Sequence, residues 1–395
     1  MVDLKDKAQA LNPQLVEWRR HVHQNPEIGF ETPETEAFIV EKLREMGIQD
    51  IQTGVAGHGL TAIIEGDKPG KVLGMRADID ALNMKEDSGQ PFASKNDYMH
   101  ACGHDAHVSM MLGAAKLIMD NKKDLSGTIK LIFQPSEETG TGAPAMIEEG
   151  VLENPTLDGI VGLHTGNLWK GPVEGQIGYR YGAIMASADW FYVTFTGKGG
   201  HGATPHLTID PVAMACQAVT ALQMIVSRKT SPLSSAVVTV GTINGGTAPN
   251  IIAPTCTISG TTRSLDPETR TMLLEQISHI CENVAQALGG TVEVKFVYGP
   301  PPLMNERIMT EKLIRAAGDV LGEKNVVEVV EPTMGGEDMA FFQEKVPGTF
   351  FFHPSGFGEG KTNPHHHPKF DVNEDVLWVG SAVLANFALT WQNEE

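Results

Sequence analysis

Histidine and cysteine are concentrated in one short segment, residues 100–107, which reads His-Ala-Cys-Gly-His-Asp-Ala-His. A thiolate and an imidazole together are good ligands for a borderline divalent metal ion. Gly103 interrupts the segment just before a helical pattern over 105–120, so we expect Cys102 and His104 on a turn between a strand and a helix. The alternative is that the three histidines, at helical spacing, form one polar helix face. The glycine inside the run and the cysteine beside it disfavour that alternative.

Two adjacent carboxylates, Glu137 and Glu138, follow an apolar run over 127–134 that is typical of a buried strand. Paired carboxylates can divide the work, with one ligating a metal ion and the other moving a proton. Consecutive side chains of an extended segment point to opposite faces, so the spacing leaves open which residue does which. A solvated acidic loop is the alternative. It is weakened because the next apolar run ends in His164, and α/β sheets gather ligands at the carboxyl edge of neighbouring strands.

Three consecutive histidines, His365 to His367, lie between Pro364 and Pro368. A histidine run near a terminus is often an expression tag, but this run is internal and bracketed by prolines. A short metal-binding tract is therefore the better interpretation. The composition does not decide which of the three imidazoles binds.

The elements that must position these residues alternate between helix and strand patterns. Apolar residues recur at helical spacing in some segments and form short buried runs in others. The predicted fold class is α/β, with a mixed, mostly parallel sheet flanked by helices. The expected helices cover 34–46, 105–120 and 374–391, and the expected strands cover 61–66, 71–82, 127–134, 157–165 and 346–354.

The sequence pattern changes after about residue 182. Apolar and polar residues alternate along 188–197 and 253–265, as in half-exposed antiparallel strands, and a helical pattern lies between them. We therefore predict an inserted α+β domain over 183–296. The remaining residues, 1–182 and 297–395, are predicted to form a discontinuous catalytic domain that carries the metal-binding residues.

Composition and charge exclude several classes of protein. The 395 residues are 41% hydrophobic and 20% charged, as in a folded protein of two or three domains. Lys and Arg number 30 against 49 Asp and Glu, and the formal net charge of −19 would repel nucleic acid and anionic lipid. The first residues do not have the pattern of a secretory signal, and no apolar run reaches the length expected of a membrane span, so we expect neither feature. We expect a cytoplasmic protein that binds neither nucleic acid nor membranes.

The four cysteines are widely scattered, without a Cys-x-x-Cys pair. A disulfide framework or a zinc ribbon is therefore not indicated. Cys216, Cys256 and Cys281 are expected to be small buried hydrophobic residues, which leaves Cys102 as the cysteine with a chemical role. Motifs of other hydrolases and of nucleotide-binding proteins are missing: the sequence has no Gly-x-Ser-x-Gly, no His-Glu-x-x-His and no complete Walker A loop.

A series of motifs, in order along nearly the whole chain, resembles the M20 metallopeptidase superfamily and, within it, the amidohydrolase branch of aminoacylases, hippurate hydrolases and indole-acetyl-amino-acid hydrolases. The motifs are RRHVHQNPEIGFET, MRADIDAL, HACGHDAH, FQPSEETGTGA, GLHTG, GKGGHGATPH, APNIIA, TTRSLD, MGGEDMAFF and HHHPKFDVNEDVL. The resemblance implies metal-dependent hydrolysis of the amide bond of an N-acyl amino acid. The alternative is a carboxypeptidase or dipeptidase with the same two-metal chemistry. A non-catalytic binding protein is the rival of another class, but it would be expected to lack a ligand or the catalytic acid, and none is missing.

The resemblance also implies the metal ions and their ligands. Two divalent ions per subunit, Mn²⁺ or Zn²⁺, with Co²⁺ or Ni²⁺ as further options, would share the Cys102 thiolate. His104 and His164 would complete one site, while Glu138 and His366 would complete the other. The C-terminal ligand is His366 because the branch pattern is His, then His or Ser, then Pro.

Two further roles in the same domain come from the resemblance. Glu137 matches the general base that takes a proton from water and then, as general acid, gives it to the leaving amine. Asp78 is implied to orient His104 or His164. One departure from the branch pattern is His365, at a position where the branch usually has an apolar residue.

The inserted domain is implied to be a lid and dimerisation domain, so we expect a homodimer or homotetramer assembled through it. His201 and Asn250 match lid residues that hold the oxyanion and the substrate, and in related dimers the partner subunit supplies the residue at the His201 position. Arg263 is a candidate for binding the carboxylate of a small N-acyl amino acid or short peptide, because a guanidinium can pair with it through two hydrogen bonds.

Overall fold

The computed structural model describes residues 4–358 and 361–392, and the chain divides into two compact units. Unit 1 comprises Met1–Ile184, Met304–Thr333 and Asp338–Glu395, and unit 2 comprises Met185–Leu303 and Met334–Glu337. Unit 2 therefore extends beyond the expected end at residue 296. One reason is that strand β13 (Thr291–Tyr298) continues past that position while paired to the unit 2 sheet.

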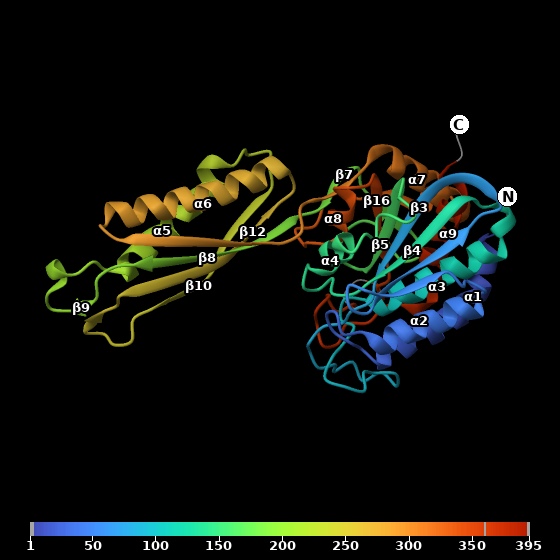
Figure 1. Ribbon diagram of the computed structural model, residues 1–395, viewed down its shortest axis with the longest axis horizontal. Helices are drawn as coiled ribbons and strands as arrows, with labels where there is room; N and C mark the ends of the chain where they lie inside the picture. The colour runs from blue at the N-terminus through green and yellow to red at the C-terminus, as the bar shows by residue number, and fades with distance from the viewer. Residues whose placement is uncertain (1–3, 359–360, 393–395) are drawn as a thin grey trace. The chain divides into compact units, whose positions relative to one another are not determined.

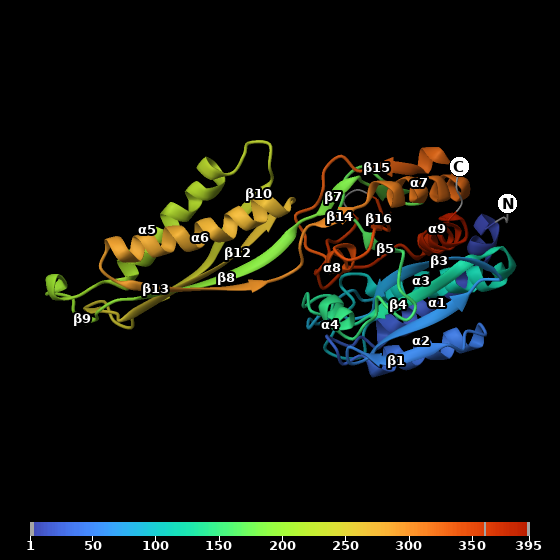
Figure 2. The ribbon, with the colours of Figure 1, turned by 45° about the horizontal axis from the view of Figure 1, so that its top comes forward.

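Unit 1 is built on one eight-stranded sheet with the strand order β1-β2-β4-β3-β5-β16-β6-β15 (Figures 1 and 2). The adjacent strands β4, β3, β5 and β16 run parallel, whereas β1, β2 and β4 pair antiparallel. The expected mixed, mostly parallel sheet is confirmed. The strands are β1 (Ile51–Val55), β2 (Gly59–Glu65), β3 (Lys68–Asp78), β4 (Ser126–Gln134), β5 (Gly159–Gly166), β6 (Ile177–Tyr179), β15 (Val326–Glu328) and β16 (Gly348–Pro354).

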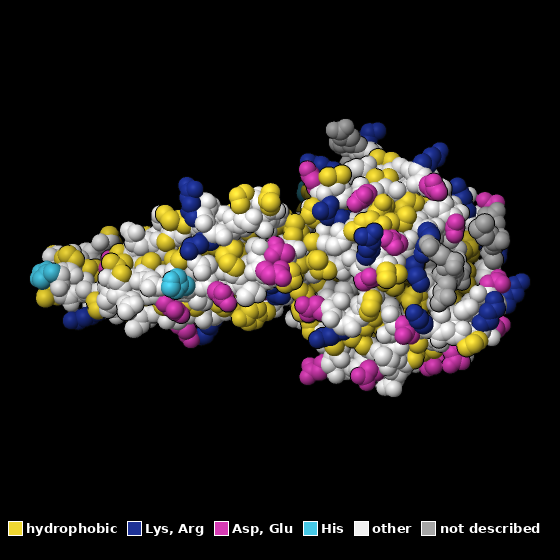
Figure 3. All heavy atoms as spheres, turned by 90° about the horizontal axis from the view of Figure 1, so that it is seen from above, with side chains coloured by type: hydrophobic (Ala, Val, Ile, Leu, Met, Phe, Trp, Pro, Cys, Tyr) yellow, Lys and Arg dark blue, Asp and Glu magenta, His cyan; other side chains and the backbone are white. Residues whose placement is uncertain are grey.

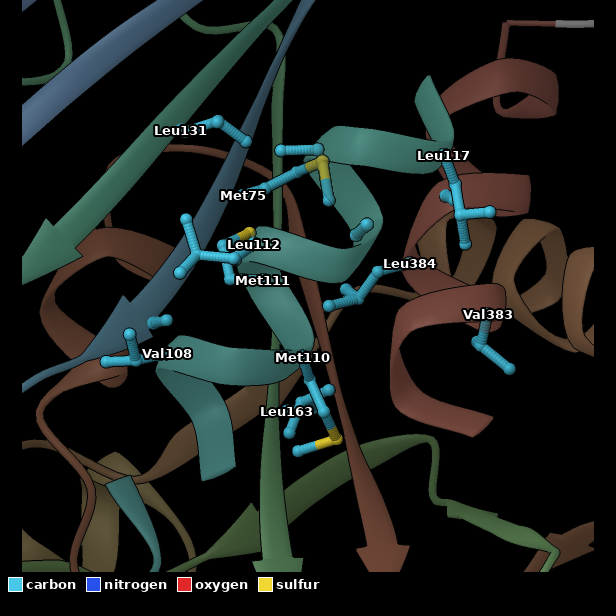
Figure 4. Close-up of a cluster of buried hydrophobic side chains, with 14 of the residues drawn as sticks. Met75, Val108, Met110, Met111, Leu112, Leu117, Leu131, Leu163, Val383 and Leu384 are labelled. Atoms are coloured by element: carbon cyan, nitrogen blue, oxygen red, sulfur yellow. The ribbon is translucent and has the colours of Figure 1, made fainter. Parts of the chain in front are cut away.

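The core of unit 1 lies around helix α3 (His104–Asp120), which contacts α1 (Leu4–Gln24), α9 (Leu377–Thr390) and strand β3. A helix that is apolar on nearly every side must be buried on every side, and Ala106 through Ala115 are all buried. Figure 4 shows Met110 and Leu112 of this helix among Leu163 of β5 and Leu384 of α9. Burial of each such side chain stabilises the fold by about 2 kcal/mol, so the N-terminus of α3 has a rigid support.

The other elements of unit 1 complete the cover of the sheet. Helix α2 packs on α3, α7 packs on α9, and α4 packs on α8. These helices are α2 (Pro33–Glu45), α4 (Gly142–Glu148), α7 (Arg307–Leu321) and α8 (Met339–Gln343), and the short strands β7 (Gly182–Met185) and β14 (Leu303–Asn305) pair with each other.

Unit 2 is a four-stranded antiparallel sheet, with the order β10-β12-β8-β13, whose one face is covered by two helices. Alternate residues of β8 show the reason: Phe191, Val193 and Phe195 are buried under the helices, whereas Trp190 and Tyr192 are 37% and 46% exposed. The expected α+β organisation of this segment is therefore present. The elements are β8 (Ser187–Thr196), β10 (Ala236–Gly245), β12 (Thr255–Ser264), β13, α5 (Pro211–Met224) and α6 (Pro267–Ala287), with the small pair β9 (Gly200–His201) and β11 (Ile251–Ile252).

The cysteines differ in one respect from the expectation. Cys256 and Cys281 are buried in the unit 2 core, but Cys216 is exposed. The buried face of α5 is formed by Met214, Ala215, Ala218 and Leu222, and Cys216 lies on the other side of that helix. The prediction that Cys216 is buried was wrong. The residue type alone does not show which face of a helix is covered by the rest of the protein.

The surface carries mixed charges. On the face shown in Figure 3, Lys and Arg side chains are interspersed with Asp and Glu side chains rather than gathered together. Within the part of the chain that the structure describes, no helix combines the length and the apolar character needed to cross a bilayer. The cytoplasmic location stays a prediction.

Candidate functional site

The chemistry-bearing residues of unit 1 meet where the central parallel strands end. Asp78 is the last residue of β3 and pairs in register with the last residue of β4, while Glu137 and Glu138 follow β4 within a few residues. His164 lies near the end of β5, and His104 is the first residue of α3. Strands that run parallel end at the same edge of a sheet, which explains why residues so distant in sequence converge.

The converging side chains form overlapping groups that could hold metal ions. One group is Cys102, His104 and His164, and another is Cys102, Glu138 and His366. Within each group the potential ligand atoms lie within 4.8 Å of one another. Cys102 Sγ is 3.5 Å from Nε2 of His164, and Nε2 of His366 is 3.4 Å from a carboxylate oxygen of Glu138. Cys102 belongs to both groups, so its sulfur is positioned where one ligand could serve two ions.

Two of the histidines are held in a single tautomer by backbone carbonyls. Nδ1 of His104 donates to the carbonyl oxygen of Asp80 at 2.9 Å, and Nδ1 of His164 donates to that of Thr165 at 2.7 Å. A carbonyl oxygen can only accept, so the proton lies on Nδ1 and the lone pair of a neutral ring lies on Nε2. Both rings therefore present Nε2 to the group, as metal-ligating histidines do.

The unpaired atoms of the cluster fit a cation. Nε2 of His104 and Oε1 of Glu138 are buried and have no hydrogen-bond partner among the described residues. Buried polar atoms without a partner are costly, and both of these can donate an electron pair once their groups are deprotonated, as metal binding requires. Together with the Cys102 sulfur they make a nitrogen, oxygen and sulfur donor set, which suits a borderline divalent ion.

The electrostatics of the cluster also favour added positive charge. Burial, together with the nearby Glu138 carboxylate, raises the pKa of the Cys102 thiol well above its usual value. Burial raises the pKa of Glu138 to about 7. Burial alone would lower the pKa of His104, but the charge of Asp78 and the hydrogen bond to Asp80 hold it well above its usual value. A divalent cation would offset the negative charge that the thiolate and carboxylates bring into a buried site.

The two adjacent carboxylates are oriented by Asp80, which the sequence interpretation did not single out. The backbone N–H groups of Glu137 and Glu138 donate to the two carboxylate oxygens of Asp80 at 3.0 and 3.2 Å. A carboxylate oxygen of Glu137 lies 3.9 Å from Nε2 of His104. The side chains of Glu137 and Glu138 are 12% and 11% exposed, so both are largely buried but still reach solvent.

Asp78 lies under the cluster and binds a histidine that was not assigned a role. It accepts hydrogen bonds from Arg76 at 2.9 Å and from Nδ1 of His107. Nε2 of His107 in turn accepts the backbone N–H of Thr165 at 2.8 Å, which holds the end of β5. Asp78 is also 3.6 Å from Nε2 of His104. Among the histidines, its contacts are thus with His104 and His107. Burial raises the pKa of Asp78, but the neighbouring cationic groups hold it well below its usual value.

The three consecutive histidines have different surroundings. His366 has a positive φ of 59°, and its side chain is 55% exposed to solvent, with Nε2 directed at Glu138. Nε2 of His365 contacts the carbonyl oxygen of Thr165 at 3.0 Å, and burial lowers the pKa of His365 to about 4. Nδ1 of His367 accepts the backbone N–H of Lys369 at 3.1 Å. A partly buried neutral ring whose hydrogen bond is satisfied explains how histidine stands at position 365 in place of an apolar residue.

The remaining predicted residues lie in unit 2 and do not all lie together. His201 and Asn250 are neighbours at the β9–β11 pair, where Gly202 N–H donates to the carbonyl oxygen of Asn250 at 2.8 Å. Arg263 lies near the opposite end of β12, beside Trp190, with its guanidinium carbon 6.0 Å from the ring centre. Strand β8 ends beside Thr255, before the chain reaches His201. The length of β12 therefore separates Arg263 from the His201 end of unit 2, roughly 25 Å at 3.3 Å per residue.

Comparison with known proteins adds a family match. The model of the peptidase family M20/M25/M40 matches residues 74–390. N-acetyl-L-cysteine deacetylase of Bacillus subtilis (strain 168) is 41% identical over 391 residues, which cover 98% of this chain and 90% of that protein. Thermostable carboxypeptidase 2 of Saccharolobus solfataricus is 38% identical over 397 residues, which cover 99% of this chain and 98% of that protein.

A solved structure agrees with the sequence matches. The crystal structure of a dinuclear metal-binding peptidase from the M20 family, from Bacillus subtilis, is similar with a TM-score of 0.84 and 34% sequence identity. The similarity covers 96% of this chain and 98% of that chain. Nearly the whole of the chain, including residues of both units, therefore matches one known architecture.

Proposed function

The chain belongs to the peptidase family M20/M25/M40, in its amidohydrolase branch, and from this premise we propose that it hydrolyses the amide bond of N-acyl amino acids. It is a metal-dependent hydrolase, as its family and its relatives are. The observation that carries the proposal is the shared position of Cys102 in two ligand groups, next to the unpaired buried atoms of His104 and Glu138.

This arrangement supports the following proposed metal-binding roles. His104 and His164 would hold one ion and Glu138 and His366 the other, with the Cys102 thiolate shared between them. Bound divalent ions supply Lewis acidity, which polarises an amide carbonyl and lowers the pKa of water. We propose Mn²⁺ or Zn²⁺, with Co²⁺ or Ni²⁺ as further options, because thiolate and imidazole ligands suit this class of ion.

Glu137 is proposed as the residue that moves the proton. Its carboxylate takes a proton from the attacking water as the new carbon–oxygen bond forms at the carbonyl carbon. The same carboxyl then gives the proton to the amine nitrogen as the carbon–nitrogen bond breaks. The products are a carboxylate and the free amino acid, and Glu137 returns to its starting state. The hydrogen bond from its backbone N–H to Asp80 supports the required orientation.

We propose that residues of unit 2 from two copies of the chain bind one substrate molecule. Arg263 would pair with the substrate carboxylate, and His201, with Asn250 beside it, would stabilise the oxyanion. Arg263 and His201 of one copy are separated by roughly the length of β12, which exceeds the size of an N-acyl amino acid. The separation supports the proposal that His201 reaches the site of a partner subunit.

Unit 2 also offers a surface through which such a homodimer, or a homotetramer, could form. Strand β10 is an edge strand of its sheet. Beside it, a groove of about 380 Å³ lies against α5 and is lined by Cys216, Val219, Thr220 and the segment 240–243. An unpaired edge strand next to small and apolar side chains favours pairing with a second copy of the same strand. Light scattering of the purified protein tests this assembly.

A panel of substrates tests the proposed reaction. Acetyl, benzoyl, longer acyl and indole-acetyl conjugates of amino acids would be assayed with Mn²⁺ and with Zn²⁺, beside dipeptides that have a free α-amino group. The proposal predicts faster hydrolysis of the N-acyl compounds. Faster hydrolysis of the dipeptides would favour the alternative, a carboxypeptidase or dipeptidase, which the similarity to a thermostable carboxypeptidase keeps open. Full activity of thoroughly metal-free protein would contradict both.

A further inference from the structure

A single buried arginine joins three distant segments of unit 1. Arg19 lies in α1, and its side chain is fully buried. Its Nε donates to Asp105 at 2.8 Å, its Nη2 to Asp371 at 2.8 Å and its Nη1 to Glu374 at 3.0 Å. The rigid guanidinium fork thus fixes three carboxylates in one arrangement.

The carboxylates that Arg19 binds belong to the two segments that carry proposed metal ligands. Asp105 directly follows His104 at the start of α3, whereas Asp371 and Glu374 follow His366. These segments are more than 250 residues apart in the sequence. In the fold they touch, because the backbone N–H of His366 donates to the carbonyl oxygen of Ala101 at 2.9 Å. Arg19 therefore connects the two ligand-bearing segments close to the point where they touch.

The two ligand-bearing segments differ in secondary structure. Cys102 and His104 adjoin helix α3, which is buried in the core. The fully described stretch 361–373 contains neither helix nor strand. It is held by the buried side chains of Phe370 and Val372 and by hydrogen bonds, including Gln90 to Asp371 at 2.8 Å and the backbone N–H of Asp87 to the carbonyl oxygen of Pro368 at 2.7 Å.

Without the Arg19 charge, the three neighbouring carboxylates would repel one another. The side chain of Asp105 is fully buried, and those of Asp371 and Glu374 are 13% and 14% exposed. Removing one partner of a buried ion pair leaves uncompensated charge and destabilises the arrangement. His23 also binds Asp105, at 2.8 Å, so Asp105 keeps one partner without Arg19. The 366–374 segment loses two ion pairs and keeps the hydrogen bonds from Gln90 to Asp371 and from Arg20 to Glu374.

We propose that Arg19 is a positioning residue that holds His366 at the distance from Cys102 and Glu138 at which the three can bind one metal ion. The inference rests on the proposed metal binding of this site. It adds a residue that contacts none of the ligands and acts through Asp371 and Glu374.

Metal titration of matched variants tests the role of Arg19. Arg19→Met removes the fork, whereas Arg20→Met removes a neighbouring arginine that is 45% exposed and donates to Glu374. Metal-free protein would be titrated with MnCl₂, and separately with ZnCl₂, by calorimetry, and its unfolding temperature measured. We expect two sites in the wild type and in Arg20→Met. In Arg19→Met we expect one site weakened by about 10–100-fold and the other unchanged.

Two further variants separate positioning from general stability. Arg19→Lys keeps the charge but not the fork, so it should recover only part of the lost affinity. Asp371→Asn removes a single partner and should weaken one site by a few-fold with little change in unfolding temperature. If Arg19→Met does not fold, the metal titration of Asp371→Asn tests the positioning role instead.

The outcomes are distinct. A folded Arg19→Met protein that binds both ions with wild-type affinity would overturn the inference, even if its unfolding temperature is lower. Unchanged binding by Asp371→Asn would do the same if Arg19→Met does not fold. Failure of the wild type to bind divalent metal would overturn the proposed function itself, and with it this inference.

Discussion

The carboxylate of Asp80 accepts the backbone N–H of Glu137 at 3.0 Å, and its second oxygen accepts the next backbone N–H. The carbonyl oxygen of Asp80 also accepts Nδ1–H of His104 at 2.9 Å. One residue therefore sets the orientation of the proposed general base and of a proposed metal ligand. Asp80 itself is 1% exposed, so these hydrogen bonds are protected from water.

Asp80→Asn is expected to impair catalysis more than folding. An amide has one oxygen and one NH₂ group, so it can accept only one of the two N–H groups and leaves the other unpaired, at a cost of about 1–3 kcal/mol. We expect kcat to fall by about 10–100-fold with little change in KM. Steady-state kinetics and thermal unfolding of the variant check this. Wild-type kcat in Asp80→Asn would show that the orientation of this turn does not limit the reaction.

Glu137→Gln and Glu138→Gln are expected to fail in different ways. Glutamine at 137 cannot take a proton, so kcat should fall by about 10²–10⁴-fold while two metal ions remain bound. Glutamine at 138 removes the charge of a proposed ligand, so the metal content should fall toward one ion per chain. Metal analysis beside activity measurement distinguishes the two. The reverse result, metal loss at 137 and a pure rate loss at 138, would exchange the proposed roles.

Mixing two inactive variants tests whether the site is shared between subunits. His201→Ala and Arg263→Ala are each expected to lose most activity. If His201 acts in the partner's site, a mixed dimer contains one intact site, so unfolding and refolding the two together should restore about a quarter of wild-type activity. Each variant refolded alone is the control. A mixture no more active than the variants alone would show that both residues serve the same subunit.

The buried pair of His23 and Asp105 predicts a loss of stability in mild alkali. Burial lowers the pKa of His23, but Asp105 and Glu86 outweigh it and raise the pKa from 6.5 to about 9. A raised folded-state pKa contributes stability that is complete below pH 6.5 and lost as the pH rises through about 9. The loss is about 3 kcal/mol, and His23→Gln should remove this pH dependence. Urea unfolding at several pH values measures the free energy of unfolding. If this free energy falls equally with pH in the wild type and in His23→Gln, the prediction is contradicted.

The elements and the residue types of the site could be predicted from the sequence. The apolar runs before Glu137 and up to His164 indicated buried strands, and Gly103 indicated the turn before a helix, because local periodicity and glycine conformation are properties of a few adjacent residues. The order of the motifs indicated the family, which the comparison with known proteins confirmed. The resemblance to this family also selected His366 as the metal ligand, whereas the composition did not distinguish among the three consecutive histidines.

What the side chains touch was decided by the tertiary structure. The spacing of Glu137 and Glu138 left their roles open, and their common hydrogen-bond acceptor, Asp80, lies just beyond the end of β3, 57 residues before Glu137. No local pattern indicated that Arg19 would bind Asp105 and Asp371, or that Cys216 would lie on the uncovered face of its helix. Sequence periodicity describes how a segment folds on itself. Which segments then meet depends on the packing of elements hundreds of residues apart, and only that packing brings charges and ligands within reach of one another.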